Sequence, residues 1–451
     1  MNGAVQLPLD VPELAIDASG GTLVRRTILP SGVRILSEHV PGSQSATVGF
    51  WVAVGSRDEE PETYGSTHFL EHLLFKGTAT RSALDIAVAF DSVGGEHNAL
   101  TAKEHTCYYA KVRDRDVDMA VRVLADMFTS STLDVDEFEN ERGVILEELA
   151  MADDDPGDVA GERFFEAVFG AHPLGRPIGG NPDSIGAVTR DAVWRHYRAN
   201  YGPRDLVVTV AGAIDHDHLV ELVREALTGA GWDLDAAATP VARRDPATGV
   251  VERGAPLVTV ERALEQVNLY LGVEGLAAAD ARRPVLTVLN SVLGGGMSSR
   301  LFQEVREKRG LAYSVYSFAS SYSDAGLVGL YAGCSPARTA DVAELMMAEF
   351  RRLAADGIDD DELRRARGQL GGASALALED SDTRMSRLGR SELTLGEFAD
   401  LDETLRRIDA VTAEEVRALA AELVDRPLSV AAVGAVSAEA FAGLADEPAA
   451  A

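Results

Sequence analysis

Apolar residues recur along this chain with two periods. An alternation of apolar and polar positions, typical of half-buried strands, covers residues 32–40, 46–54 and 107–112. Apolar positions three and four apart, typical of helices, cover residues 64–76, 114–130 and 136–151. The first half of the chain therefore mixes strands with runs of helices.

The second half has the same character. Its strand patterns cover residues 267–272, 313–319 and 327–333. Its helical patterns cover residues 284–293 and 299–308. Strands followed by runs of helices predict an α+β fold, with helices packed on one face of a largely antiparallel sheet.

The two halves also resemble each other. Residues 185–193 read IGAVTRDAV and residues 408–416 read IDAVTAEEV, and 408 − 185 = 223. A helical pattern and a buried strand ending in Gly follow each motif, at Gly212 and Gly434, and 434 − 212 = 222. Two matches at nearly one offset predict two homologous domains. The Pro-, Gly- and charge-rich stretch 239–254 is the predicted linker between domains 1–238 and 255–451.

Charge and composition narrow the function classes. The formal net charge of −30 argues against nucleic acid as a partner, because phosphate contacts need a basic surface. The sequence contains no run of 18 apolar residues, so it predicts no membrane span. The N-terminal residues are acidic and show no signal-peptide pattern, so we expect a cytoplasmic protein. Cys107 and Cys334 match no metal or redox spacing and are predicted to be buried thiols.

The sequence His68-Phe-Leu-Glu71-His72 is the sharpest candidate for chemistry. On a helix, residues four apart share a face, so both imidazoles can reach one ion. Zinc accepts imidazole and carboxylate ligands and keeps a position open for water in catalytic sites. Glu71 is then the predicted general base. Residues 65–67 (Gly-Ser-Thr) are the predicted N-cap of this helix.

A third ligand is predicted on the helix at 136–151. Glu141 and Glu148 lie seven residues, or two turns, apart and share a face with Val144 and Ile145. That face is predicted to be buried, where an unpaired carboxylate is costly. Spacing alone favours Glu148 only weakly over Glu141.

These residues resemble the pitrilysin, insulysin and mitochondrial processing peptidase family, in which H-x-x-E-H is an inverted zinc motif. The resemblance runs from about residue 24 to 434. The length of the protein is similar to that of the shorter, processing-peptidase-like branch of the family. The resemblance rests on several stretches in order, which are GSRDE (55–59), FKGT (75–78), NALT (98–101), EHTCYY (104–109) and DDDP (153–156). It implies one Zn²⁺ per chain held by His68, His72 and Glu148, with Glu141 as a further glutamate near the site.

The second half lacks H-x-x-E-H and has a Gly-rich stretch at 293–302 instead. This stretch has no G-K-[ST] ending, so it does not predict a phosphate loop. Arg306 and Tyr313 follow, seven residues apart. From the residues alone, Arg306 is predicted to lie on a solvated helix face and Tyr313 to be an aromatic residue of a strand. The family resemblance implies that both hold substrate near the metal, where Arg donates paired hydrogen bonds and Tyr stabilises an oxyanion.

Further predictions concern a possible peptide-binding edge and four other histidines. The resemblance places Asn98 and Ala99 at a sheet edge, where an extended peptide could add as a strand. His97 and His105 are predicted to be structural. His216 and His218 lie among aspartates and are predicted to be solvated.

The hypothesis is a zinc-dependent endopeptidase that hydrolyses peptides or unfolded segments with a metal-activated water. The resemblance implies a homodimer, and a heterodimer with an inactive homologue is the alternative. Imidazole and carboxylate ligands also accept manganese or cobalt. Two rival hypotheses are a non-catalytic assembly subunit, of the kind some relatives became after losing zinc ligands, and a metalloenzyme for a non-peptide substrate.

Overall fold

Seven strands from the first half of the chain form one sheet in the order β2-β3-β4-β8-β5-β7-β6. Strands β4 and β8 run parallel, and every other neighbouring pair is antiparallel. In chain order the strands are β2 (Glu13–Asp17), β3 (Leu23–Ile28), β4 (Arg34–His39), β5 (Ser45–Val52), β6 (Glu96–Thr101), β7 (Thr106–Arg113) and β8 (Val207–Gly212).

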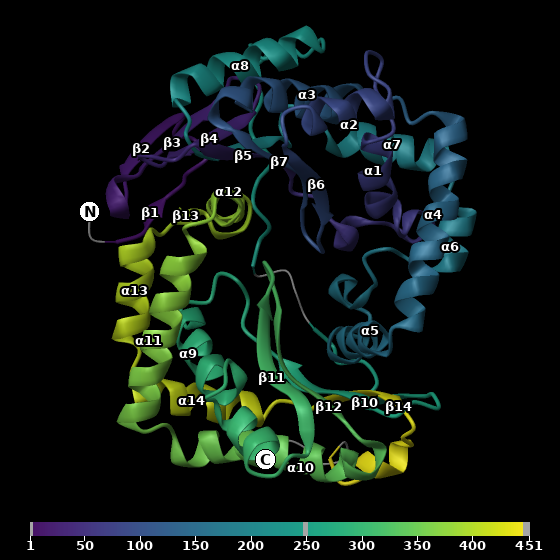
Figure 1. Cartoon of the computed structure of the whole chain (residues 1–451), viewed down its shortest axis with the longest axis vertical. Coiled ribbons are helices and arrows are strands. Elements are labelled where there is room, and N and C mark those ends of the chain that lie inside the picture. Colours follow the sequence, from purple (N-terminus) through teal and green to yellow (C-terminus); the bar gives the residue numbers. More distant parts are fainter. Residues whose placement is uncertain (1–2, 247–250, 445–451) are drawn as a thin grey trace. The chain divides into compact units, whose positions relative to one another are not determined.

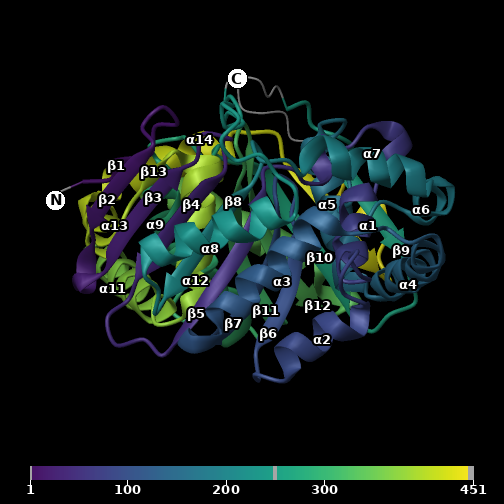
Figure 2. The same ribbon diagram turned by 90° about the horizontal axis from the view of Figure 1, so that it is seen from above.

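Helices cover one face of this sheet (Figure 2). Alternate residues of β5, such as Val48 and Phe50, are fully buried against them because successive strand side chains point to opposite faces. Leu73 and Leu124, which belong to the helices, pack into the same core. The helices here are α1 (Ser66–Leu74), α2 (Ala83–Asp91), α3 (Val117–Ser130), α4 (Val135–Asp154), α6 (Pro182–Ala187), α7 (Arg190–Asn200) and α8 (His216–Gly229).

The opposite face of the same sheet carries one helix, α12 (Ser381–Arg390), from the second half of the chain. Gly389 lets α12 approach Trp51, since a Cβ there would lie 2.5 Å from the indole ring. Arg387 and the fully buried Glu38 form an ion pair at 2.9 Å. A short strand, β13 (Glu397–Phe398), then pairs with β1 (Val5–Gln6).

The second half forms a five-stranded sheet in the order β11-β12-β10-β14-β9. Its strands are β9 (Leu257–Glu261), β10 (Val267–Glu274), β11 (Ala312–Ser321), β12 (Gly326–Cys334) and β14 (Ser429–Gly434). Only β9 and β14 run parallel. Its helices are α9 (Arg283–Gly294), α10 (Thr339–Asp356), α11 (Asp360–Ala377), α13 (Leu401–Ala410) and α14 (Ala413–Val424). Helix α5 (Pro156–Phe169), from the first half, packs Phe164 on the other face.

The predicted α+β class with two related domains is confirmed. In both sheets the strand that follows the repeated motif, β8 or β14, lies between a parallel and an antiparallel neighbour. Helices α7 and α14 both begin after a threonine whose side chain caps them, Thr189 and Thr412. Gly212 and Gly434 both have a positive φ, 126° and 148°, which favours glycine.

The computed structural model describes residues 3–246 and 251–444 (Figure 1). Residues group into two compact units, each assembled from three segments. The first unit is Met1–Leu149, Pro177–Arg243 and Ala375–Glu403, and the second is Ala150–Arg176, Arg244–Ser374 and Thr404–Ala451. The boundary at 239–254 stays a prediction about the sequence halves, and residues 247–250 of it lie outside the described part. In the described ranges no helix is long and apolar enough to cross a bilayer.

The prediction that His216 is solvated is wrong. Its side chain is buried against strands β3 and β4, with Nε2 2.9 Å from Thr27 and Nδ1 2.8 Å from Ser37. The Thr27 hydroxyl donates to Glu13, so it accepts from Nε2–H of His216. Burial, assisted by the Arg25 charge, lowers the pKa of His216 to about 4. His218 is exposed as predicted and pairs with Asp118 at 2.8 Å.

We expect this histidine to make the first unit acid-sensitive. The unfolded chain takes up a proton near pH 6.5, whereas folded His216 does so only near pH 4, so stability falls as the pH drops through that window. The thermal midpoint of the wild type should fall several degrees more between pH 6.5 and 4 than that of His216→Gln. His218→Gln is the control of opposite sign, because Asp118 raises the pKa of His218. Parallel curves for wild type and His216→Gln would contradict the prediction.

Candidate metal centre

Helix α1, which carries the H-x-x-E-H motif, begins at an unusual cap. Its N-cap, Gly65, has φ 90°, and a Cβ there would lie 2.5 Å from Ile185. The Glu59 carboxylate accepts the backbone N–H groups of Gly65 at 2.8 Å and Thr67 at 2.7 Å. Of the predicted N-cap residues 65–67, Gly65 is the N-cap and the other two lie in the first turn of α1. A carboxylate six residues before Gly65 supplies the hydrogen bonds that the first turn needs.

Three of the predicted residues meet beside α1. Glu148 Oε2 lies 3.7 Å from His68 Nε2 and 3.5 Å from His72 Nε2. One nitrogen or oxygen from each of the three residues lies within 4.8 Å of the other two. The imidazole rings stand edge to face with their centroids 4.8 Å apart. Burial, and next the neighbouring His72, lower the pKa of His68, which favours the neutral ring that binds metals.

Glu141 and Lys76 form an outer layer behind His72. Glu141 is 4% exposed, and its Oε2 lies 3.0 Å from His72 Nδ1. Lys76, one turn after His72, places Nζ 2.7 Å from Glu141 Oε1. Because the paired carboxylate only accepts, Nδ1 carries the hydrogen and Nε2 keeps its lone pair for a metal.

The predicted burial of the Glu148 face is wrong. Glu141 and Ile145 are buried, but Val144 is 50% exposed and the Glu148 side chain is 52% exposed. The buried stripe of α4 ends before Glu148, since the helix there borders the metal centre and not the core. An exposed ligand suits a centre that must admit water and substrate.

Glu71 lies on the same helix and contacts the sheet. Its Oε2 accepts a hydrogen bond from the hydroxyl of Thr101, the last residue of β6. Strand β6 ends the sheet and pairs only with β7 among the described strands. Asn98 and Ala99 therefore do lie on an edge strand, and their contact with a peptide stays a prediction. The Thr101 contact was not predicted.

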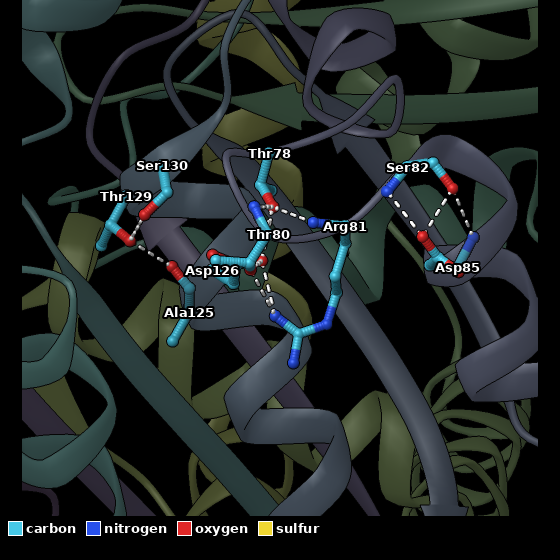
Figure 3. Close-up of polar contacts among 9 residues, drawn as sticks. All are labelled: Thr78, Thr80, Arg81, Ser82, Asp85, Ala125, Asp126, Thr129 and Ser130. Atoms are coloured by element: carbon cyan, nitrogen blue, oxygen red, sulfur yellow. Dashed lines mark hydrogen bonds and ion pairs between the residues drawn. The ribbon is translucent and has the colours of Figure 1, made fainter.

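One carboxylate anchors the turn that follows α1 (Figure 3). Asp126 of α3 accepts hydrogen bonds from Thr78 at 2.6 Å, Thr80 at 3.0 Å and Arg81 at 2.6 Å. The Thr78 hydroxyl also accepts the backbone N–H groups of Thr80 and Arg81. This turn starts two residues after Lys76, so it helps to fix the chain segment between α1 and the turn, which contains Lys76.

The other histidines near the motif have packing roles. The His97 ring stacks on Phe90 with centroids 4.4 Å apart, and His105 lies 5.5 Å from the Trp51 ring. His196 of α7 contacts the Thr67 hydroxyl at 3.2 Å, and burial lowers its pKa to about 4. The structural role predicted for His97 and His105 agrees with these contacts.

Arg306 and Tyr313 lie together in the second unit. The Arg306 guanidinium lies over the ring of Tyr313, with Cζ 4.4 Å from its centroid, and over the ring of Phe302, at 4.8 Å. Its Nη1 donates to the Tyr313 carbonyl at 2.9 Å, and Tyr313 is 78% exposed. His68, His72 and Glu148, the predicted zinc ligands, belong to the first unit. The approach of Arg306 and Tyr313 to the metal therefore stays a prediction.

The donor set fits a zinc ion. Two imidazoles and one carboxylate converge, one ring is oriented by a buried glutamate, and a further carboxylate, Glu71, is adjacent in sequence. Outer partners such as Glu141 raise metal affinity by about 10- to 100-fold in other proteins.

Removing the Lys76 charge should weaken zinc binding. We expect Lys76→Met to raise the zinc dissociation constant by about 3- to 10-fold, because Glu141 loses its ion pair and orients His72 less firmly. Competition with a chromophoric chelator measures the constant. Lys111→Met is a matched control, since Lys111 is similarly exposed (31% against 33%) and pairs with Asp380 at 2.6 Å. Equal constants for both variants would contradict the prediction.

Comparison with known families agrees with this architecture. Residues 34–182 match the profile "Insulinase (Peptidase family M16)", and residues 187–370 match "Peptidase M16 inactive domain". The chain belongs to the M16 peptidase family. The match to the inactive domain begins near the end of the first half and covers most of the second, and residues 187–370 contain no H-x-x-E-H.

Similar proteins span nearly the same length. An uncharacterized zinc protease of Streptomyces coelicolor is 50% identical, with 91% of this chain and 89% of that protein aligned. An uncharacterized zinc protease of Bacillus subtilis is 39% identical over 91% of this chain and 98% of its own. A protease from Helicobacter pylori has the same fold, with a TM-score of 0.81 at 22% identity, covering 91% of this chain and 99% of that one.

Proposed function

We propose that the protein is a zinc-dependent endopeptidase that hydrolyses peptides or unfolded protein segments. The convergence of His68, His72 and Glu148 beside Glu71 carries this proposal. Zinc bound by these three ligands would act as a Lewis acid that activates water and polarises the scissile carbonyl. The family and the names of the relatives support the same activity.

Residues of the chain supply the remaining steps. Glu71 accepts the proton of the attacking water and then delivers it to the leaving amine. Glu141 orients His72. Asn98 and Ala99, on an edge strand, pair with the backbone of an extended peptide, a mode of binding that would accept different side chains. Arg306 and Tyr313, from the same chain or a partner, hold the substrate carbonyl and stabilise its developing charge.

We further propose a cytoplasmic homodimer, with a heterodimer containing an inactive homologue as the alternative. Both cysteines, Cys107 and Cys334, are buried free thiols, as a reducing compartment allows. Size-exclusion chromatography with light scattering distinguishes a homodimer from a monomer that awaits another subunit.

Digestion of a mixed library of end-blocked peptides tests the activity, with zinc measured on the same sample. Blocked ends restrict cleavage to internal bonds. We expect about one zinc per chain, internal cuts, loss of cleavage with a chelator and recovery with added zinc. A protein that binds no zinc would overturn the proposal. A zinc-loaded protein that cuts nothing would indicate a missing subunit or a non-peptide substrate.

A further inference from the structure

We propose that Thr101 is a positioning residue that holds the Glu71 carboxylate in place for proton transfer. The inference rests on the proposed peptidase activity. Its basis is the hydrogen bond from the Thr101 hydroxyl to Glu71 Oε2. The bond joins helix α1 to strand β6 across 30 residues of sequence.

The contact restricts a side chain that would otherwise be mobile. Glu71 has three rotatable bonds and stands on a helix of nine residues. Thr101 is 6% exposed, and β-branching stiffens its side chain. Strand β6 is paired with β7 along all six of its residues, so the hydroxyl has a fixed origin. The hydrogen bond occupies Oε2, and Oε1 has no hydrogen-bond partner among the described residues, which leaves it to take the proton.

Strand β6 also joins the base to the proposed substrate edge. Asn98 and Ala99 precede Thr101 by three and two residues, or roughly 7–10 Å along a strand. The strand that pairs with the peptide backbone is thus the strand that restrains Glu71. Peptide and base then share one rigid frame, and misplacing a reacting group by about 1 Å can cost 10²-fold in rate.

Replacing the hydroxyl by a methyl group tests this role. Thr101→Val keeps the side-chain shape and removes the donor. We expect kcat for a library peptide to fall about 10- to 100-fold, with KM within about twofold of the wild-type value and zinc content unchanged. Thr101→Ser, which restores the hydroxyl, should return kcat to within about threefold of wild type.

The hairpin offers a matched control in Thr106, which lies directly opposite Thr101. Its hydroxyl donates to the Val54 carbonyl at 2.9 Å instead of to Glu71. Thr106→Val removes the same group from the same hairpin and should leave kcat within about threefold of wild type. The proposal is overturned if Thr101→Val keeps full kcat, if it loses zinc, or if Thr106→Val lowers kcat equally.

A second measurement needs no peptide cleavage. Thermal midpoints of the metal-free wild type, Thr101→Val, Glu71→Met and the double variant form a cycle that reports the contact itself. We expect Thr101→Val to lower the midpoint more in the wild type than in the Glu71→Met background. Additive shifts would show that Thr101 and Glu71 do not interact, and would overturn the inference. A coupled cycle in a protein that cuts no peptide would instead place the failure in the proposed function.

Discussion

Glu71→Gln should abolish peptide cleavage while the protein keeps its zinc. We expect kcat to fall by about 10³-fold or more, because an amide cannot take the proton of the attacking water. Zinc should remain because Glu71 is not among the three residues whose ligand atoms converge. Turnover of the best library peptide and zinc content, measured on one preparation, check both halves of the prediction.

A nearby glutamate provides the control for this variant. Glu62 is exposed and precedes α1. Glu62→Gln should cleave at the wild-type rate, which would separate the role of Glu71 from a general loss of negative charge. Retention of more than about a tenth of the wild-type kcat by Glu71→Gln would place the general base elsewhere. Loss of zinc would show that Glu71 supports the metal.

The helical part of the site was predictable from local spacing. His68, Glu71 and His72 share one face of α1 because positions three and four apart always do. The α+β class followed from strand and helix periods, and the repeated Gly212 and Gly434 marked corresponding strands of two sheets. These features depend on neighbours in sequence or on an internal copy, so the chain itself carries the signal.

Features that depend on tertiary pairing were not predictable in this way. The Thr101–Glu71 bond requires the placement of β6 relative to α1, which no local pattern specifies. His216 was predicted to be solvated from its acidic neighbours, although β3 and β4 bury it. The packing of α12 on the sheet of the first half also required the structure. The position of Lys76 near the site was predictable, because Lys76 follows His72 by four residues, about one helical turn.

Glu148 was chosen over Glu141 by family resemblance, so its role needs a direct test. Glu148→Gln should raise the zinc dissociation constant by at least about 100-fold, beyond the usual effect of an outer partner, because a neutral amide replaces a charged ligand. Chelator competition measures the constant. Cleavage should be lost at limiting zinc and partly restored by excess zinc, whereas Glu71→Gln should stay inactive at any zinc concentration.

Glu147, the residue next to Glu148, provides a strict control for Glu148→Gln. Glu147 is also exposed on α4, but it does not contribute to the converging ligand set. Glu147→Gln removes the same charge one position away and should bind zinc as the wild type does. If Glu148→Gln binds zinc within about threefold of wild type, Glu148 is not the third ligand. Glu141 would then be the candidate, and the hydrogen bond that it forms with His72 would have to break for its carboxylate to reach the metal.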